Sequence, residues 1–316
     1  MMEFLPLGLD LDGSILLQSR LMARLHEVMA FRAHEHALRL WACGRSIKEL
    51  RDAIQGLRHR YSQPWFMFFG SGDFHHVTLV LLETLPNMLQ PVTLVLIDQH
   101  PDWFVSPPRY HCGNWVAGAL RLPWVRSAVL VGQGHADLAG HQFWFAPFKD
   151  LCRGRIRLVP YATSRIRVPL RWPVSVEGAA RSIRRWYGVE LQFDTIAAHG
   201  ITQVFDELAE RLSGCRAYLS IDKDCLKNQF AITDWDQGQL SLDDLLQGIQ
   251  RLQRSVQIVG IDVCGDAAPS ALRGLFKRID ASRVTPRSMA SNEDNGVNER
   301  TNLSLLEAFS AKSHRS

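Results

Sequence analysis

The chain lacks the features that mark several common protein classes. Its six cysteines are scattered without a CxxC pair, which argues against a disulfide framework and favours a reducing, cytoplasmic setting. No apolar run approaches the roughly 18 residues of a membrane span, and the first residues have no basic start typical of a signal peptide. The formal net charge of +4 is too small to indicate nucleic-acid binding by itself. We therefore expect a soluble cytoplasmic protein that acts on a small molecule, and a homo-oligomer is compatible with this.

What the chain does contain is typical of a globular α/β protein: 46% of its 316 residues are hydrophobic and 22% are charged. Its polar motifs are spread from position 75 to position 224, and their convergence predicts one domain over 1–316. Within it we expect an N-terminal helical part over 1–60, with a long helix over 16–41 and a second over 46–56 that starts with a capping box. An arginine-rich excursion is expected over 150–190 and a polar, mobile segment over 284–297.

The organising stretch is 91–103, PVTLVLIDQHPDW. A short, continuous apolar run ending abruptly in polar residues is typical of a buried parallel strand. Ligands of open α/β sheets gather beyond the carboxyl ends of such strands. Asp98, His100 and Asp102 follow this run at alternating positions, so they point toward a common centre. The stretch therefore predicts both a central strand and the start of a metal site.

Two further stretches have the same form. The apolar run over 65–70 leads into His75, and the run over 217–221 leads into Asp222 and Asp224. Three strand ends thus contribute one set of metal-capable side chains: His75, Asp98, His100, Asp102, Asp222 and Asp224. Carboxylates about 4 Å apart repel by roughly 4 kcal/mol per pair at an effective dielectric constant near 20. No arginine is interleaved among them, so a pair of metal ions is the expected compensation.

These residues carry a resemblance to a known family. GDFHHVT, IDQHPDW and SIDKD resemble the metal motifs GGDHSxT, DAHxD and SxDxD of the ureohydrolases, which include arginase, agmatinase and formimidoylglutamase. With weaker matches after them, the resemblance covers about 65–309. It implies a three-layer α/β/α fold with a mainly parallel sheet, of the arginase/deacetylase-like type.

The resemblance also implies a binuclear centre. One ion would be held by His75, Asp98, Asp102 and Asp222, and the other by His100, Asp224 and the shared Asp98 and Asp222. It implies Mn²⁺, although another divalent metal is compatible with the same ligands, and imidazole with carboxylate oxygens suits Mn²⁺ better than a thiol-loving metal. Two such ions would lower the pKa of a water for attack on an sp² carbon.

The substrate end departs from the family pattern, which makes the chain an atypical member. The family's proton-shuttling histidine falls on Val116, and its substrate-facing acid falls on Gly265 or Asp266. His111 is the candidate to replace the shuttle, because a histidine carries protons near neutral pH. Asn114 lies in a turn that resembles the family's SGN turn, so Asn114 and Asp266 are the candidate substrate contacts.

The resulting hypothesis is a metal-dependent hydrolase that cleaves a C–N bond of a guanidino, amidino or amide compound. Asp102 would orient the attacking water and take its proton, and His111 would protonate the leaving amine. One alternative is a metal-binding protein of the same fold without turnover. Another is a haloacid-dehalogenase-type phosphatase with Asp10 as nucleophile, because LGLDLDGSI at 7–15 resembles that family's DxDGT motif. The competing interpretation is an N-terminal strand followed by a turn that caps the next helix through Asp12 or Ser14.

Overall fold

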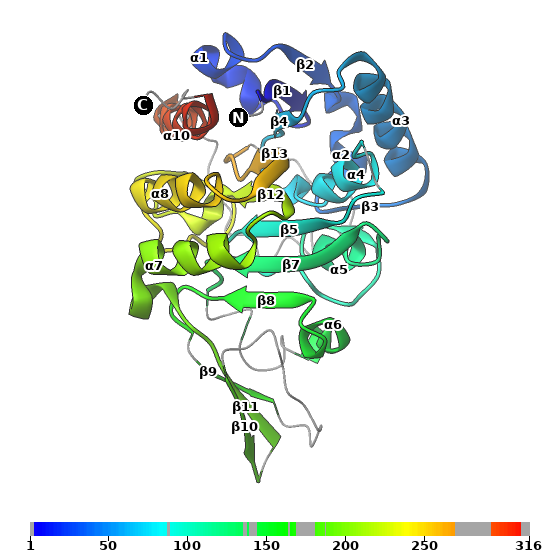
Figure 1. Ribbon diagram of the computed structural model, residues 1–316. Coiled ribbons are helices and arrows are strands. Elements are labelled where there is room, and N and C mark those ends of the chain that lie inside the picture. Colours follow the sequence, from blue (N-terminus) through cyan, green and yellow to red (C-terminus); the bar gives the residue numbers. More distant parts are fainter. Residues whose placement is uncertain are drawn as a thin grey trace.

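A computed structural model describes residues 3–86, 89–134, 138, 144–163, 165–168, 181–186, 188–268 and 292–310. Its centre is a parallel sheet of eight strands in the order β2-β1-β4-β13-β12-β5-β7-β8 (Figure 1). In that order the strands are β2 (Glu27–Ala30), β1 (Leu5–Asp10), β4 (Trp65–Phe68), β13 (Gln257–Cys264), β12 (Arg216–Asp222), β5 (Val92–Ile97), β7 (Val125–Val131) and β8 (Ile156–Val159).

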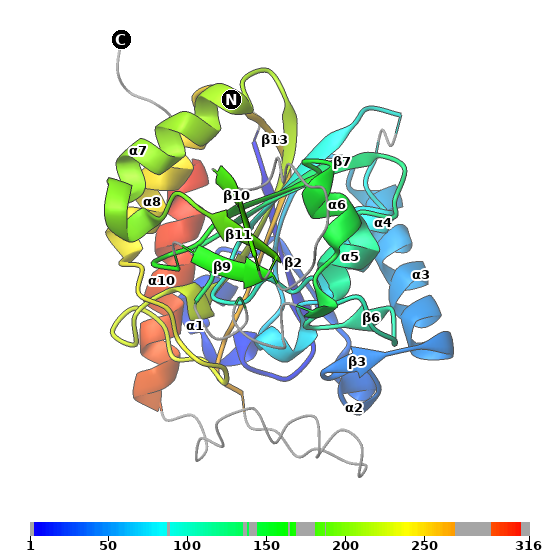
Figure 2. The same ribbon diagram turned by 90° about the horizontal axis from the view of Figure 1, so that it is seen from below.

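Helices cover both faces of this sheet, as Figure 2 shows in the view along it. One face carries α3 (Gly44–Arg60), α4 (Val77–Glu83), α5 (Trp115–Ala119) and α6 (Phe148–Cys152). The other carries α7 (Ile196–Arg211), α8 (Leu242–Leu252) and α10 (Asn292–Ser310). This is the predicted three-layer α/β/α architecture, which the structure confirms.

The central strand β5 shows why the sheet is buried on both sides. Leu94 and Leu96 pack in the hydrophobic cluster under α3, α4 and α5. Val95 and Ile97 pack in the cluster under α7, α8 and α10. Because side chains alternate across a strand, a continuous apolar run serves both clusters, as expected for a parallel strand covered by helices.

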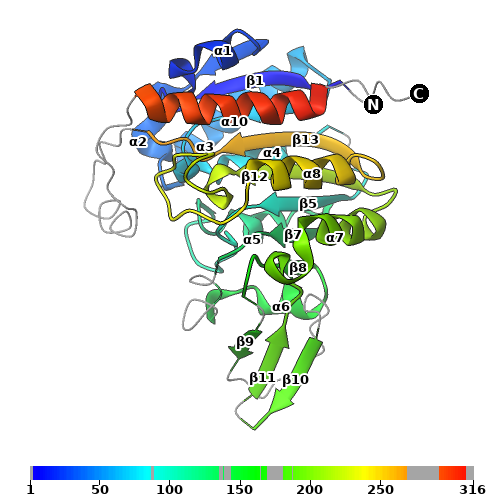
Figure 3. The same ribbon diagram turned by 90° about the vertical axis from the view of Figure 1, so that its left-hand side faces the viewer.

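Two smaller sheets stand apart from the main one. The strands β9 (Arg165–Val168), β11 (Gly188–Gln192) and β10 (Arg181–Arg185) form an antiparallel sheet that projects beyond β8 (Figure 3). The predicted basic excursion therefore contains two different structures, because its early part forms β8 at the edge of the main sheet. The strands β3 (Trp41–Ala42) and β6 (Tyr110–His111), the second of which contains the candidate residue His111, form a two-stranded antiparallel sheet.

The long helix expected over 16–41 is wrong. This segment forms the 3-10 turn η1 (Ile15–Leu17), the helical turn α1 (Ser19–Met22), strand β2, the turn η2 (Arg32–His34) and the helical turn α2 (Glu35–Leu38). Leu16 and Leu17 are 44% and 59% exposed, so the periodic leucines do not share one buried face. Parallel pairing of β2 with β1 overrides the helical pattern.

Three boundary details also differ from expectation. The helix α3 begins at Gly44 and its start has no side-chain cap, so the capping box predicted at Ser46 is absent, and Ser46 Oγ donates to the Cys43 carbonyl. Positions 284–291 of the polar segment lie outside the described residues, and 292–297 belong to the helix α10. No described helix is both long and apolar enough to cross a membrane.

All eight strands of the main sheet run the same way, so their carboxyl ends meet at one edge. The four neighbours β4, β13, β12 and β5 lie in the middle of the sheet. Each runs directly into polar residues: Ser71 after β4, Asp266 after β13, Asp224 after β12 and Asp98 after β5. A binding or catalytic site is therefore expected beyond the carboxyl ends of these four central strands.

Candidate metal centre

The first group of metal-capable side chains surrounds His75. This histidine ends the 3-10 turn η3 (Gly72–Phe74) that follows β4. Its Nδ1 atom lies 3.2 Å from Asp98 Oδ2, 3.0 Å from Asp102 Oδ2 and 3.5 Å from Asp222 Oδ2. All four residues are buried. One ring nitrogen thus faces three carboxylates that come from two other strand ends.

The second group lies around His100. Its Nδ1 atom is 2.8 Å from Asp224 Oδ2 and 3.7 Å from Asp98 Oδ1. Asp98 belongs to both groups, because one carboxylate oxygen faces each histidine. The structure therefore brings together all six residues that the sequence nominated as metal ligands, and it places Asp98 between the two histidines.

Hydrogen bonds hold the three strand-end carboxylates in a common orientation. Asp98 Oδ1 accepts the His100 N–H at 2.6 Å, and Asp222 Oδ1 accepts the Asp224 N–H at 2.9 Å. Asp224 Oδ1 accepts the Gln99 N–H at 3.1 Å. In each case the Oδ1 atom is tied to the backbone, and the Oδ2 atom faces a histidine Nδ1. The three Oδ2 atoms therefore face the histidine rings and not the backbone.

A buried network orients the His75 ring from behind. Its Nε2 atom lies 2.9 Å from Ser220 Oγ, and Ser220 in turn donates to Asp262 at 2.7 Å. Tyr218 also donates to Asp262, at 2.7 Å. Such partners on the far side of a histidine fix which ring nitrogen a metal would meet. Asp262 is fully buried in β13, as the sequence predicted, and its contacts give it this supporting role.

Asp102 is held from the side of α5. The Trp115 indole N–H donates to Asp102 Oδ2 at 2.7 Å, and the Val116 N–H donates to the Asp102 carbonyl at 3.0 Å. Asp102 has φ +44°, in the left-handed region that residues other than glycine rarely adopt. The helix α5, which carries Val116, therefore serves to position Asp102.

The electrostatics of the cluster favour a bound cation. Burial, followed by repulsion from Asp224 and Asp102, raises the pKa of Asp98 well above its ordinary value. Burial and Asp224 raise the pKa of Asp222 to about 7. Asp98 Oδ2 is moreover a buried oxygen that accepts no hydrogen bond. Imidazole nitrogens and crowded carboxylate oxygens are ligands that suit divalent metal ions, because the positive charge of the ion offsets the repulsion between the carboxylates.

Both residues predicted to contact the substrate already bind other groups of the protein. Asn114 Nδ2 donates to the carbonyls of Ser106 (2.7 Å) and Pro108 (2.6 Å), so its amide braces the preceding loop. Asp266 forms a buried ion pair with Lys223, whose side chain has no exposed surface. A substrate would have to open one of these contacts to reach either side chain.

His111 lies in β6, and its Nδ1 atom accepts the Gly113 N–H at 2.9 Å. Its backbone N–H donates to Asn114 Oδ1 at 3.1 Å. These contacts place His111 in the turn that leads directly into Trp115 and the Asp102 contact. Its expected role as a proton carrier stays a prediction.

The residues of the competing phosphatase hypothesis have turn roles. Asp10 Oδ1 accepts the Gly13 N–H at 2.8 Å. Asp12 accepts from both the backbone and the hydroxyl of Ser14 and, across the sheet edge, from the Ser71 N–H at 2.9 Å. The strand interpretation of this stretch is confirmed by β1, and the geometry gives Asp10 a place in a strand-end turn.

Sequence reasoning missed four residues that shape the site. These are Trp115, Lys223, Trp235 and Cys264. Trp235 borders His100, with ring centroids 5.7 Å apart, and its indole donates to Asp73 at 3.0 Å. Trp115 and Lys223 had a usable signal, because Trp115 directly follows the turn that resembles a family motif and Lys223 lies inside SIDKD. The other two depend on strand order and on side-chain direction.

Comparisons with known proteins agree with this geometry at the level of the fold. No profile of a known protein family matches the chain. It is 25% identical over 202 residues to an uncharacterized protein of Thermotoga maritima, and this alignment covers 64% of the chain and 58% of that protein. The chain thus spans little more than half the length of the curated relative that it matches.

Solved structures align over nearly the whole chain. An agmatine ureohydrolase of Thermoplasma volcanium aligns with TM-score 0.57 at 13% identity, over 98% of this chain and 90% of that one. A putative agmatinase from Clostridium difficile gives 0.58 at 13% identity, over 98% of both chains. The arginase of Bacillus subtilis gives 0.56 at 12% identity, over 99% of this chain and 100% of that one. The chain therefore has the ureohydrolase fold, as the sequence motifs predicted.

Proposed function

We propose that this protein is a binuclear metal-dependent hydrolase that cleaves a C–N bond of a guanidino, amidino or amide compound. The observation that carries the proposal is the convergence of two histidine Nδ1 atoms on carboxylate oxygens around the shared Asp98. The ureohydrolase fold supports it, because amidino hydrolysis is what several of the aligned structures are named for.

The proposed ligand sets combine the two groups with the family resemblance, which implies that Asp222 is shared between both ions. His75, Asp98, Asp102 and Asp222 would hold one ion, and His100, Asp98, Asp222 and Asp224 would hold the other. The oxygen-rich set around His100 suits Mn²⁺. When bound, the ions supply Lewis acidity at the substrate carbon and a water made more acidic than in bulk.

The remaining chemistry belongs to the side chains. Asp102 lies at the edge of the first group, fixed by Trp115 at 2.7 Å, so it can orient the attacking water and accept its proton. The turn that carries His111 joins directly to Trp115, and His111 would return a proton to the departing amine. Proton acceptance and proton donation are thereby assigned to two different groups.

Access to the centre runs along the His100 side. The His100 side chain is 20% exposed, whereas the side chains of His75, Asp98 and Asp224 are at most 2% exposed. The Trp235 ring borders this open side. A substrate that reaches the ions would therefore pass an aromatic wall, which suits the flat, delocalised face of a guanidino or amide group.

The test is a substrate screen on metal-loaded protein. Guanidino and amidino compounds are followed by urea and ammonia release, and acylated amines by amine release. We expect turnover in one of the two classes with Mn²⁺ or another divalent ion, and none after removal of metal by a chelator. Protein reloaded after chelation is the control, because its recovered activity shows that the fold survived.

The second candidate, a non-catalytic metal-binding protein, is favoured by two observations. The Asp266 carboxylate that would meet a cationic substrate is already paired with Lys223, and Val116 stands where the family has its shuttle. Silence in both assays, with two ions bound per chain, would establish this alternative.

The role of His111 gives a separate prediction. His111→Ala should lower kcat about a hundredfold, as expected for loss of a general acid, with metal content unchanged because His111 lies in neither ligand group. The measurement is kcat as a function of pH. The decrease in kcat at high pH that reports deprotonation of the general acid should disappear in the variant. A variant with wild-type kcat at every pH would remove His111 from the mechanism.

A further inference from the structure

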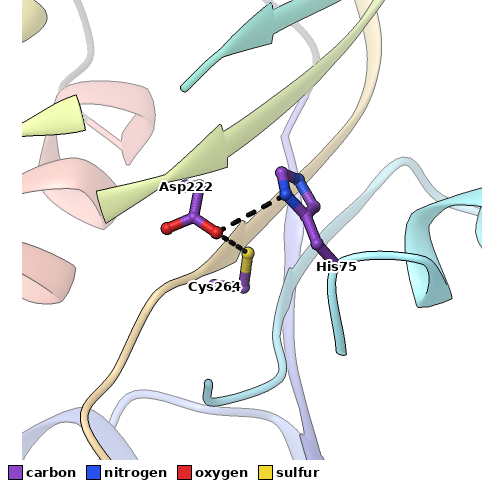
Figure 4. Close-up of side chains that lie close together, drawn as sticks. All are labelled: His75, Asp222 and Cys264. Atoms are coloured by element: carbon purple, nitrogen blue, oxygen red, sulfur yellow. Dashed lines mark hydrogen bonds and ion pairs between the residues drawn. The ribbon is translucent and has the colours of Figure 1, made fainter. Parts of the chain in front are cut away.

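A cysteine thiol lies beside the first ligand group. Cys264 is the last residue of β13, which lies between β4 and β12 in the sheet. In the register of β12 and β13, Cys264 is the direct partner of Asp222. Figure 4 shows its sulfur next to the Asp222 carboxylate, with the His75 ring across from both. Cys264 is buried with 1% of its surface exposed.

The spacing of these three donors is that of a metal site. Cys264 Sγ lies 3.1 Å from Asp222 Oδ2, and Asp222 Oδ2 lies 3.5 Å from His75 Nδ1. All three ligand atoms are within 4.8 Å of one another. Bonds of about 2.0–2.3 Å to nitrogen, oxygen and sulfur around a tetrahedral ion place the donors roughly 3.4–3.7 Å apart. The separation of 3.5 Å falls within this range, and the separation of 3.1 Å is slightly shorter.

Two further observations concern residues that border this group. Asp98 Oδ2, on the other side of His75 Nδ1 at 3.2 Å, is a buried oxygen that accepts no hydrogen bond. Gly265, directly after the cysteine, has φ +89°, and a Cβ atom there would lie 2.3 Å from Asp222 Oδ1. Only glycine lets the chain after β13 pass this close to the Asp222 carboxylate, and the register of β12 and β13 places the thiol beside the same residue.

We propose that Cys264 is a metal ligand on the His75 side of the centre, which gives that position a mixed nitrogen, oxygen and sulfur donor set. The inference rests on the binuclear centre of the proposed function and refines it. On binding, the ion replaces the S–H proton that the thiol shares with Asp222, and this proton leaves to solvent. Thiolate ligands select Zn²⁺ or another thiophilic ion over Mn²⁺. The two positions therefore prefer different metals: a thiophilic ion at His75 and a hard ion at His100.

The chain offers a matched control in Cys225. It is equally buried, with 1% of its surface exposed, and it directly follows the ligand residue Asp224. It belongs to none of the metal-capable groups formed by the described residues. Substitution of Cys225 thus perturbs the same edge of the sheet without removing a donor from either group.

The experiment uses Co²⁺ as a spectroscopic probe of chelator-stripped, full-length protein. Bound cobalt should give a near-ultraviolet thiolate-to-metal charge-transfer band, which Cys225→Ala keeps and Cys264→Ser loses. Competition titrations should show that Cys264→Ser weakens Zn²⁺ binding at the tighter site at least about tenfold. Mn²⁺ binding should change much less, because Mn²⁺ gains little from sulfur.

A second measurement does not depend on the variant folding. X-ray absorption of the native zinc-loaded protein should show a sulfur neighbour at about 2.3 Å.

A variant with Cys264 as its only cysteine should keep the charge-transfer band. Cobalt bound without that band, or a band that persists in Cys264→Ser, overturns the assignment and leaves the binuclear centre intact. Failure to bind any divalent ion would instead remove the proposed function itself.

Discussion

Replacing Asp98 with asparagine is expected to abolish the stabilisation that divalent metal gives the protein, together with its hydrolytic activity. Asp98 is the residue shared by the His75 group and the His100 group, so its loss weakens both positions. A ligand at a hundred times its Kd stabilises the folded state by about 2.7 kcal/mol, or roughly 4 °C in Tm for a chain of this size. Asp98→Asn should show almost none of this shift, and kcat should fall about a thousandfold or more.

The metal-free protein should respond in the opposite direction. Burial and two neighbouring carboxylates already raise the pKa of Asp98, so a neutral asparagine of the same shape relieves repulsion. Chelated Asp98→Asn should therefore be as stable as chelated wild type, or more so. Differential scanning fluorimetry with and without Mn²⁺ or Zn²⁺ measures both effects. Asp52→Asn, exposed on α3, is the control and should keep the full metal-dependent shift. A variant that keeps the shift would show that the centre is not built on Asp98.

The central part of the site could be predicted from sequence because it depends on local pattern. The run Val92–Ile97 is continuous and apolar, it ends at Asp98, and both the strand and its polar tip were found where expected. The same reasoning located His75 after β4 and Asp222 at the end of β12. Because the strands are parallel, their carboxyl ends all lie at the same end of the sheet. These residues therefore come together without further information from the sequence.

The remainder depends on pairings that no local pattern encodes. The position of β13 between β4 and β12 brings Cys264 beside Asp222, and it also brings Asp266 to Lys223. From sequence alone Asp266 was an acid without a partner. Likewise, the leucine periodicity after position 15 predicted a helix, but Glu27–Ala30 pairs with β1 and becomes the outer strand β2 of the sheet. Tertiary pairing decided both cases against local preference.

Arg39→Ala should lower the free energy of unfolding by about 3–5 kcal/mol, the cost of leaving a buried carboxylate without its partner. Arg39 has no exposed surface, and its guanidinium donates to Asp73 Oδ2 at 2.7 Å and to Glu35 Oε1 at 2.9 Å. It also lies over the Phe74 ring, 4.9 Å from the centroid. This one side chain therefore ties the segment around α2 to the turn that presents His75.

The control for this prediction is Arg45→Ala. Arg45 also donates to a glutamate four residues away, Glu49, at 2.6 Å, but its side chain is 91% exposed. Such a pair contributes about 0.3–0.5 kcal/mol, so the two arginines test burial with the chemistry held constant. Urea unfolding of both variants in the same metal state measures the difference. Equal losses would mean that desolvation cancels the attraction in the Arg39 pair.

The pH dependence of the Arg39→Ala loss identifies its cause. Burial raises the pKa of Asp73 even in the native protein, while Arg39 opposes this rise. Without Arg39 the folded-state pKa rises further above the unfolded value, so folded protein takes up a proton at higher pH. The stability that this proton provides is present at low pH and is lost as pH rises through the new pKa. The deficit of Arg39→Ala should consequently be smaller at pH 5 than at pH 8. In Arg39→Met/Asp73→Asn, which removes both charges, the deficit should be smaller still and nearly independent of pH, because no unpaired carboxylate remains to titrate.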